Sequence, residues 1–140
     1  MDLTAALDFA RTNHHGVLTT IRANGRPQLS NVAYHAGDDG TIGISITATR
    51  AKYTNLLRMP WAALHVTRSD FYAYAVIEAD VQVSPVAAQP DDGTVDQLVA
   101  YYRAVAGEHE DWNEYREAMV ADQRVYLRLR PDRAYGMLPS

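Results

Sequence analysis

Two cations and an amide lie close together at the predicted start of a helix. Arg50, Lys52 and Asn55 follow Thr49, which we expect to cap a helix over residues 50–59. Lys52 and Asn55 are one helical turn apart and project to the same side, with Arg50 just before them. The amino end of a helix carries partial positive charge and unpaired N–H groups, so two cations there are unfavourable unless they share an anion. The spacing suits a phosphate site, but a solvated basic face is the commoner explanation of such a cluster by itself, and the polar strand that precedes it shifts the balance toward the phosphate.

A second set of polar residues lies on the strand predicted for residues 27–34. Gln28 and Ser30 fall on one face of this strand by its period of two, and Asn31 falls on the other. A strand that served only the core would carry apolar residues on one of these faces. Amide and hydroxyl groups can instead exchange hydrogen bonds with a flat heterocycle or a sugar alcohol. An edge strand with its polar face in water explains the same pattern about equally well.

Aromatic and histidine residues give weaker signals. Phe71, Tyr72 and Tyr74 lie at the start of the fifth predicted strand. They suit the cover of a planar ligand or a dimer contact, and ordinary core packing is the alternative. The adjacent residues His14 and His15 point apart on a helix or a strand, and the sequence has no HExxH pattern, so we assign no metal site. P-loop, nucleophile-elbow and dinucleotide glycine motifs are also absent from the sequence.

Composition narrows the class of protein. The 140 residues fit one domain over residues 1–140, which is small for an enclosed active site, so a site between subunits is expected. The net charge of −4 argues against a nucleic-acid partner, because phosphate-driven binding needs a basic face. The sequence has no cysteine, which excludes disulfides and thiolate ligands and fits a cytoplasmic location. No apolar run approaches the roughly 18 residues of a membrane span, so we expect no membrane insertion.

Hydrophobic patterning predicts the elements that would position these residues. Turn residues at 24–25 and 38–40 indicate hairpins between strands. Ile42, Ile44 and Ile46 share one face of a strand. The pattern predicts a mainly β fold, a closed or half-closed antiparallel barrel with inserted helices. The predicted helices are residues 2–12, 50–59 and a helical segment at about 91–122 that is broken at 107, and the predicted strands are 17–21, 27–34, 41–46, 62–66, 72–83, 124–130 and a short one at 134–137.

Several segments of the sequence together resemble one protein family. They read GRPQLSN at 25–31, RAKYTNL at 50–56, YAV at 74–76 and YYRAVAGEH at 101–109, and residues 111–112 and 115–120 add to the likeness. The chain resembles the actinobacterial split β-barrel flavin and deazaflavin oxidoreductases, in the branch that uses the deazaflavin coenzyme F420 and is related to pyridoxamine 5′-phosphate oxidases. The likeness extends from about residue 16 to residue 135, nearly the whole chain.

The resemblance implies a six-stranded antiparallel split β-barrel that forms a homodimer, with the cofactor in a groove at the subunit interface. Arg50 and Lys52 would hold the phosphate of the cofactor with help from Asn55. This agrees with the argument from the charges at the helix start. The other implied cofactor-binding positions are Gln28, Ser30, Asn31 and Ser45 along the path of the ring and ribityl chain, and Tyr72 and Tyr74 from the partner subunit.

The chemistry that the resemblance implies is hydride transfer from C5 of the reduced deazaflavin to an electron-poor small molecule, such as a conjugated carbonyl or a quinone-like compound. The cofactor carries out that step, so we assign no catalytic residue, and Tyr72, Tyr74 or solvent would supply a proton. Arg11, Arg124 and Arg133 are candidates to contact the longer anionic tail of the deazaflavin. The alternatives are an FMN-dependent enzyme of the pyridoxamine phosphate oxidase type and a protein that binds or carries F420 without turnover.

Overall fold

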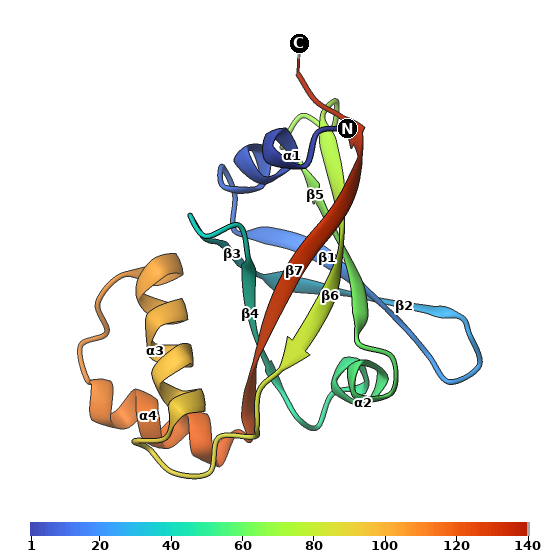
Figure 1. The fold of residues 1–140 in the computed structure, drawn as a ribbon. Helices are drawn as coiled ribbons and strands as arrows, with labels where there is room; N and C mark the ends of the chain where they lie inside the picture. The colour runs from blue at the N-terminus through green and yellow to red at the C-terminus, as the bar shows by residue number, and fades with distance from the viewer. Residues whose placement is uncertain (140) are drawn as a thin grey trace.

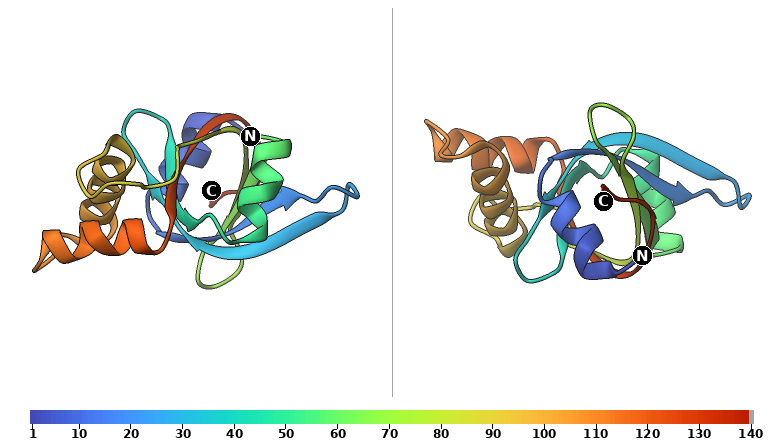
Figure 2. Two further views of the ribbon diagram at one scale, coloured as in Figure 1. Left: turned by 90° about the horizontal axis from the view of Figure 1, so that it is seen from below. Right: turned by 90° about the horizontal axis from the view of Figure 1, so that it is seen from above.

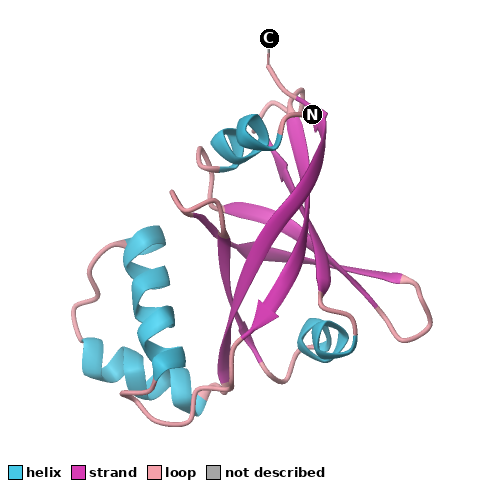
Figure 3. Cartoon of the chain, viewed as in Figure 1, coloured by secondary structure: helices cyan, strands magenta, loops and turns pink. Residues whose placement is uncertain are grey.

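A curled antiparallel sheet forms the body of the molecule, and helices lie around it (Figures 1 and 3). The computed structural model describes residues 1–139. Its strands are β1 His15–Ile21, β2 Pro27–Ala33, β3 His35–Ala36, β4 Ile42–Thr47, β5 Trp61–Thr67, β6 Tyr74–Val83 and β7 Arg124–Met137. Its helices are α1 Leu3–Ala10, α2 Ala51–Arg58, α3 Gly93–Ala106 and α4 Trp112–Ala121. The strands form one sheet in the order β2-β1-β5-β6-β7-β4-β3.

The sheet curls into a half-barrel with an open seam (Figure 2). Strand β2 forms one edge of the sheet and β3 the other, and β4 lies next to β3. This architecture confirms the mainly β, antiparallel prediction. The six strands that the resemblance implies are too few, because the sheet within residues 1–139 has seven. Strand β3 was missed because its two residues, His35 and Ala36, are too few for an alternating pattern.

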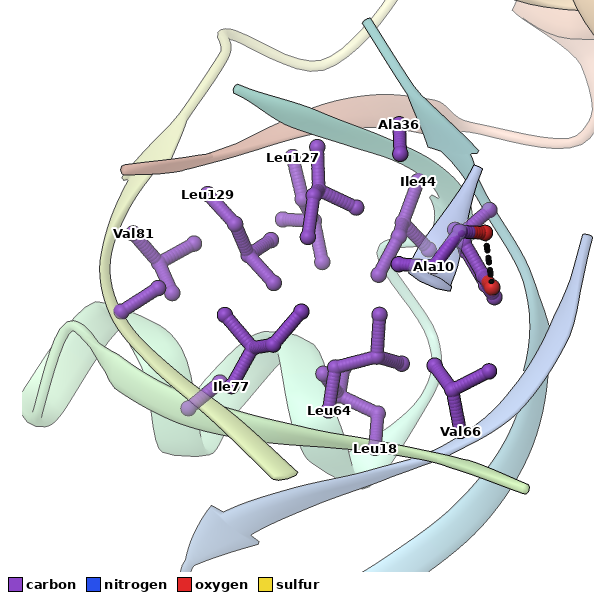
Figure 4. Packing of buried hydrophobic residues seen from close by; sticks show 14 of the residues in the cluster. Ala10, Leu18, Ala36, Ile44, Leu64, Val66, Ile77, Val81, Leu127 and Leu129 are labelled. Carbon is purple, nitrogen blue, oxygen red and sulfur yellow. Dashed lines mark hydrogen bonds between the residues drawn. The ribbon is translucent and has the colours of Figure 1, made fainter. Parts of the chain in front are cut away.

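Branched apolar side chains fill the interior of the curl (Figure 4). Ile42, Ile44 and Ile46 are buried on β4, as their spacing predicts. Helix α1 packs against the same core, and the Tyr34 hydroxyl donates a hydrogen bond to the Ala10 carbonyl at 2.7 Å. The core therefore holds the strands in a fixed curl and leaves the seam as its open side. Other fully buried members include Leu18, Leu64, Ile77, Leu127 and Leu129.

Strand β7 is one continuous strand of 14 residues, where the sequence pattern predicted two. Its register with β6 passes from Ala79 opposite Pro131 to Glu78 opposite Arg133, so Asp132 is accommodated in a bulge. A bulge tolerates proline, which cannot donate to the ladder. Pro131 interrupts the alternation of the sequence but not the strand.

Helices α3 and α4 lie together beside β4 and β7 (Figure 1). Asp92 and Asp111 cap them, each carboxylate accepting a backbone N–H of the first turn, and Gly107 ends α3 with a φ of 82°. No helix within residues 1–139 has the length and apolar character to cross a bilayer. The two helices share a small core of their own, which includes Val95, Leu98, Tyr115 and Met119.

Candidate functional site

The seam between β2 and β4 holds a polar cavity of about 410 Å³. Strand β2 forms one wall, β4 forms the other, and the start of α2 closes one end. Five residues predicted from the sequence meet here: Ser30, Asn31, Ser45, Arg50 and Lys52. The lining is completed by Val32 and Ala33 from β2, Ile46 and Thr47 from β4, and Arg124 from the first position of β7.

The start of α2 presents positive charge and uncapped N–H groups to this cavity. Arg50 is the N-cap residue, and its side chain makes no capping hydrogen bond. The prediction that Thr49 caps the helix is wrong, because its hydroxyl pairs with the Thr47 hydroxyl at 3.1 Å. The first turn contains no acidic residue. An anion in the cavity would therefore satisfy the orphan N–H groups and the nearby cations together.

The charged form of Lys52 is destabilised in the ligand-free protein. Its pKa is lowered from the ordinary lysine value, chiefly by desolvation, and further by the positive charges of Arg50 and Arg124. A cation whose pKa is lowered by other cations lies at a position of positive potential. A bound anion would reverse that potential and restore the proton affinity of Lys52.

Arg124 is the third cation of the cavity. Its Nε is buried and has no hydrogen-bond partner among residues 1–139. The nearest acid is Asp122, whose Oδ2 lies 3.8 Å from that Nε, and the Ser45 hydroxyl is 3.5 Å from Nη1. Both separations are too long for strong hydrogen bonds. The guanidinium therefore retains donor capacity for a ligand.

Register rather than local sequence brings Arg124 to this position. The ladder between β4 and β7 pairs it with Thr47, beside the start of α2. The other two cations considered for an anionic tail lie elsewhere. Arg11 donates to the Gly37 carbonyl and pairs with Asp8, while Arg133 lies on the far half of β7 opposite Glu78.

Asn55 and Gln28 lie beside the cavity but bond to each other. Asn55 is only 6% exposed, and its Nδ2 donates to Gln28 Oε1 at 2.9 Å and to Thr20 Oγ1 at 3.1 Å. The amide donors of Asn55 are therefore used to fasten α2 to β1 and β2. Neither residue lines the cavity between β2 and β4.

Tyr72 and Tyr74 lie away from the cavity in the same chain. Tyr72 is 80% exposed in the connection between β5 and β6, and the Tyr74 ring packs on His65 with 5.4 Å between ring centroids. The predicted strand start at residue 72 is wrong, because Phe71 takes a φ of 73° in a turn and β6 begins at Tyr74. Their contribution from a partner subunit stays a prediction.

A second hollow of about 540 Å³ adjoins the polar cavity. The two share Asn31, Val32 and Ala33 on β2 as lining residues, so both lie against this edge strand. Most of the accessible lining of this hollow is apolar. No group of three or more histidine, aspartate or glutamate side chains within residues 1–139 could hold a metal ion. The other lining residues of the hollow are Asn13, His15, Gly16, Val17 and Thr67.

The curled antiparallel half-barrel is the split-barrel fold of the family whose model this sequence matches. The chain belongs to the pyridoxamine 5′-phosphate oxidase family, which matches residues 3–138. The family resemblance expected from the sequence is thereby confirmed.

Solved structures share this fold at low sequence identity. A conserved hypothetical protein, Rv2991 from Mycobacterium tuberculosis, is 21% identical with a TM-score of 0.75, over 100% of this chain and 90% of the other. An F420 reductase is 22% identical with a TM-score of 0.63, over 91% and 94% of the two chains. A pyridoxamine 5′-phosphate oxidase-related, FMN-binding protein from Nostoc punctiforme is 13% identical with a TM-score of 0.60, over 96% and 78%. At these identities the likeness concerns the fold.

Proposed function

We propose that this protein is an F420-dependent oxidoreductase that passes hydride from the reduced deazaflavin to an electron-poor small molecule, a conjugated carbonyl or a quinone-like compound. The observation that carries the proposal is the convergence of Arg50, Lys52 and Arg124 on one cavity at an uncapped helix start. Such a pocket is suited to a phosphorylated cofactor. Membership of the pyridoxamine 5′-phosphate oxidase family and the F420-type sequence motifs support the same class.

The number of cations favours the deazaflavin over FMN. The phosphate monoester of FMN carries a charge of about −1.5 to −2 near neutral pH, which compensates two cations. Arg50 and Lys52 fill that role at the helix start. Arg124 is a third cation, and its buried Nε is without a partner among residues 1–139. A deazaflavin phosphate that is esterified to a tail carries one negative charge, and the anionic groups of the tail add the negative charge that the remaining cations need.

Some of the remaining predicted residues would contact the cofactor, and the others hold the wall of the cavity and α2 in place. Ser45 and Ser30 offer hydroxyls to a sugar-like chain, and Asn31 lines both the polar cavity and the apolar hollow. The planar part of the cofactor and the acceptor would use that hollow. Gln28 and Asn55 hold the wall and the helix in place through their mutual hydrogen bond. The deazaflavin, when bound, supplies the hydride, and the chain supplies position, charge balance and exclusion of water.

The cofactor preference is tested by titrating apoprotein with F420, with FMN, and with a deazaflavin that lacks the phosphate and tail. We expect F420 to bind most tightly and the phosphate-free deazaflavin to bind at least about tenfold more weakly, because it cannot engage the cations. Unchanged fluorescence and mobility of F420 at tens of micromolar would contradict the proposal. A yellow protein that retains FMN against F420 would support the FMN-dependent oxidase instead.

Turnover separates an enzyme from a binding protein. Reduced F420 is mixed with the protein and a panel of enones and quinones, and its reoxidation is followed by absorbance. Tight binding with no reoxidation above the protein-free rate would assign a carrier role. Loss of the signal in a Lys52→Ala variant is the control for contaminating activity.

We also propose that the protein forms a homodimer in which Tyr72 and Tyr74 reach the partner's cofactor and serve as candidate proton donors. The β6–β7 ladder pairs Tyr74 with Met137 and Val76 with Tyr135, so these side chains share an outer face. Tyr135 and Met137 on this face, and Tyr72 in the connection before β6, are more than half exposed, which is unusual for a monomer surface.

Sedimentation is expected to give about twice the 15.6 kDa of one chain. A Tyr135→Asp variant should lower that mass to the monomer value, because it introduces a charge into the apolar contact. Its F420 affinity should fall in parallel if the partner contributes to the site. A monomeric mass for the unmodified protein at micromolar concentration would contradict the proposal.

A further inference from the structure

The free edge of β2 directs peptide groups into the cavity. The Tyr34 N–H donates to the His14 carbonyl on the β1 side, at 2.8 Å. Backbone groups of successive residues in an antiparallel strand alternate in direction, so Ser30 and Val32 also face β1. The peptide groups of Asn31 and Ala33 therefore point the other way, toward the seam. Any displacement of β2 would therefore change where the peptide groups of Asn31 and Ala33 lie in the cavity.

One side-chain hydrogen bond crosses the seam at the end of β2. The Tyr101 hydroxyl, from α3, donates to the Ala33 carbonyl at 3.0 Å. The Tyr101 ring meets the Tyr126 ring on β7 edge to face, with 6.3 Å between centroids. Tyr126 pairs with Ser45 in the β4–β7 ladder. Tyr101 thus links the free edge of β2 to the opposite wall of the cavity.

A second link holds β2 at its other end. Asn55 on α2, which follows β4, donates to Gln28 as described above. The two links lie at opposite ends of the strand segment that contains Ser30 and Asn31. At about 3.3 Å per residue, they are roughly 17 Å apart along the strand. The wall between them lacks a neighbouring strand on the seam side.

We propose that Tyr101 is a positioning residue that holds the edge of β2 at the distance from β4 required to grip the cofactor. Its role in binding rests on the proposed function, but its effect on the edge strand does not. Burial raises the pKa of the Tyr101 hydroxyl, so the group stays protonated and able to donate at physiological pH. Removing the donor frees one end of the wall and leaves the three cations in place.

The test compares Tyr101→Phe with Tyr115→Phe. Tyr115 donates to the Leu98 carbonyl at 2.8 Å inside the helical pair, so its variant loses a similar bond away from the cavity. In ligand-free protein, we expect Tyr101→Phe to speed amide exchange at Ser30 and Val32, and Tyr115→Phe to leave these amides unchanged. We expect Tyr101→Phe to raise the Kd for F420 about three- to tenfold, mainly through faster dissociation. Tyr115→Phe should change it less than twofold.

Unchanged exchange at Ser30 and Val32 in Tyr101→Phe would overturn the proposal, whatever the cofactor. Faster exchange with an unchanged Kd would overturn the positioning role. Equal changes in both variants would assign the bond to general stability of the helical pair and reject it as a specific link. If the unmodified protein binds neither F420 nor FMN, the proposed function fails, and the exchange measurement still decides whether Tyr101 holds the edge.

Discussion

Replacing Lys52 with alanine is expected to weaken F420 binding by about 1.5–3 kcal/mol, roughly ten- to a hundredfold. The side chain is a partly desolvated cation beside Arg50 and Arg124, and its lowered pKa reflects that unfavourable free state. An anionic ligand turns the same position into a favourable one, so the loss of the charge should cost more than that of a surface lysine. Fluorescence titration of the variant measures the change.

Arg26→Ala provides a control of equal charge change. Arg26 is exposed in the turn between β1 and β2 and does not line the cavity. Its replacement should change the Kd less than twofold, since exposed charges outside the site are screened by salt. An equal loss of F420 affinity in Lys52→Ala and Arg26→Ala would show that only the net charge of the protein matters. An unchanged Kd in Lys52→Ala would reject the role assigned to Lys52.

The pH dependence of F420 affinity should differ between the unmodified protein, which has lysine at position 52, and a Lys52→Arg variant. Because the pKa of Lys52 is lowered in the free protein, its charge is lost at a lower pH than that of an ordinary lysine. Affinity for the anionic cofactor should therefore fall as pH rises through that lowered pKa. Lys52→Arg keeps its charge over the whole range, so its affinity should stay flat there. Parallel profiles for the two proteins would contradict this origin of the pH dependence.

Asn55→Ala should lower the free energy of unfolding by about 2–4 kcal/mol. The substitution removes both hydrogen bonds of the Nδ2 group and leaves the buried Thr20 hydroxyl and the Gln28 carbonyl oxygen without that donor. It also opens a cavity beneath α2. Urea denaturation monitored by circular dichroism gives the value.

Thr54→Ala is the matched control, because Thr54 lies on the same helix and is exposed. We expect Thr54→Ala to change the free energy of unfolding by no more than about 0.5 kcal/mol. Thr20→Val removes the hydrogen bond between Thr20 and Asn55 from the Thr20 side. The losses of unfolding free energy in Thr20→Val and Asn55→Ala should therefore be less than additive in the double variant. Additive effects, or a loss below about 1 kcal/mol in Asn55→Ala, would contradict the fastening role of this residue.

Local spacing was sufficient to predict much of the fold. The isoleucines of β4 and the break at Gly107 are found as expected. Each of these signals depends on residues within one or two turns of each other, where backbone geometry fixes the neighbours. The same reason explains the partial success at Arg50 and Lys52, which the start of a helix places together.

The sequence by itself determined the β-rich class and the concentration of charge at the start of α2. Only the tertiary structure decided which distant residues complete the site. Arg124 enters the cavity through its register with Thr47, Tyr101 reaches Ala33 from a separate layer, and Asn55 turns its amide inward to Thr20. These contacts depend on how the whole sheet curls and packs. The physical reason is that strand register and layer packing are collective properties, which no short window of residues specifies.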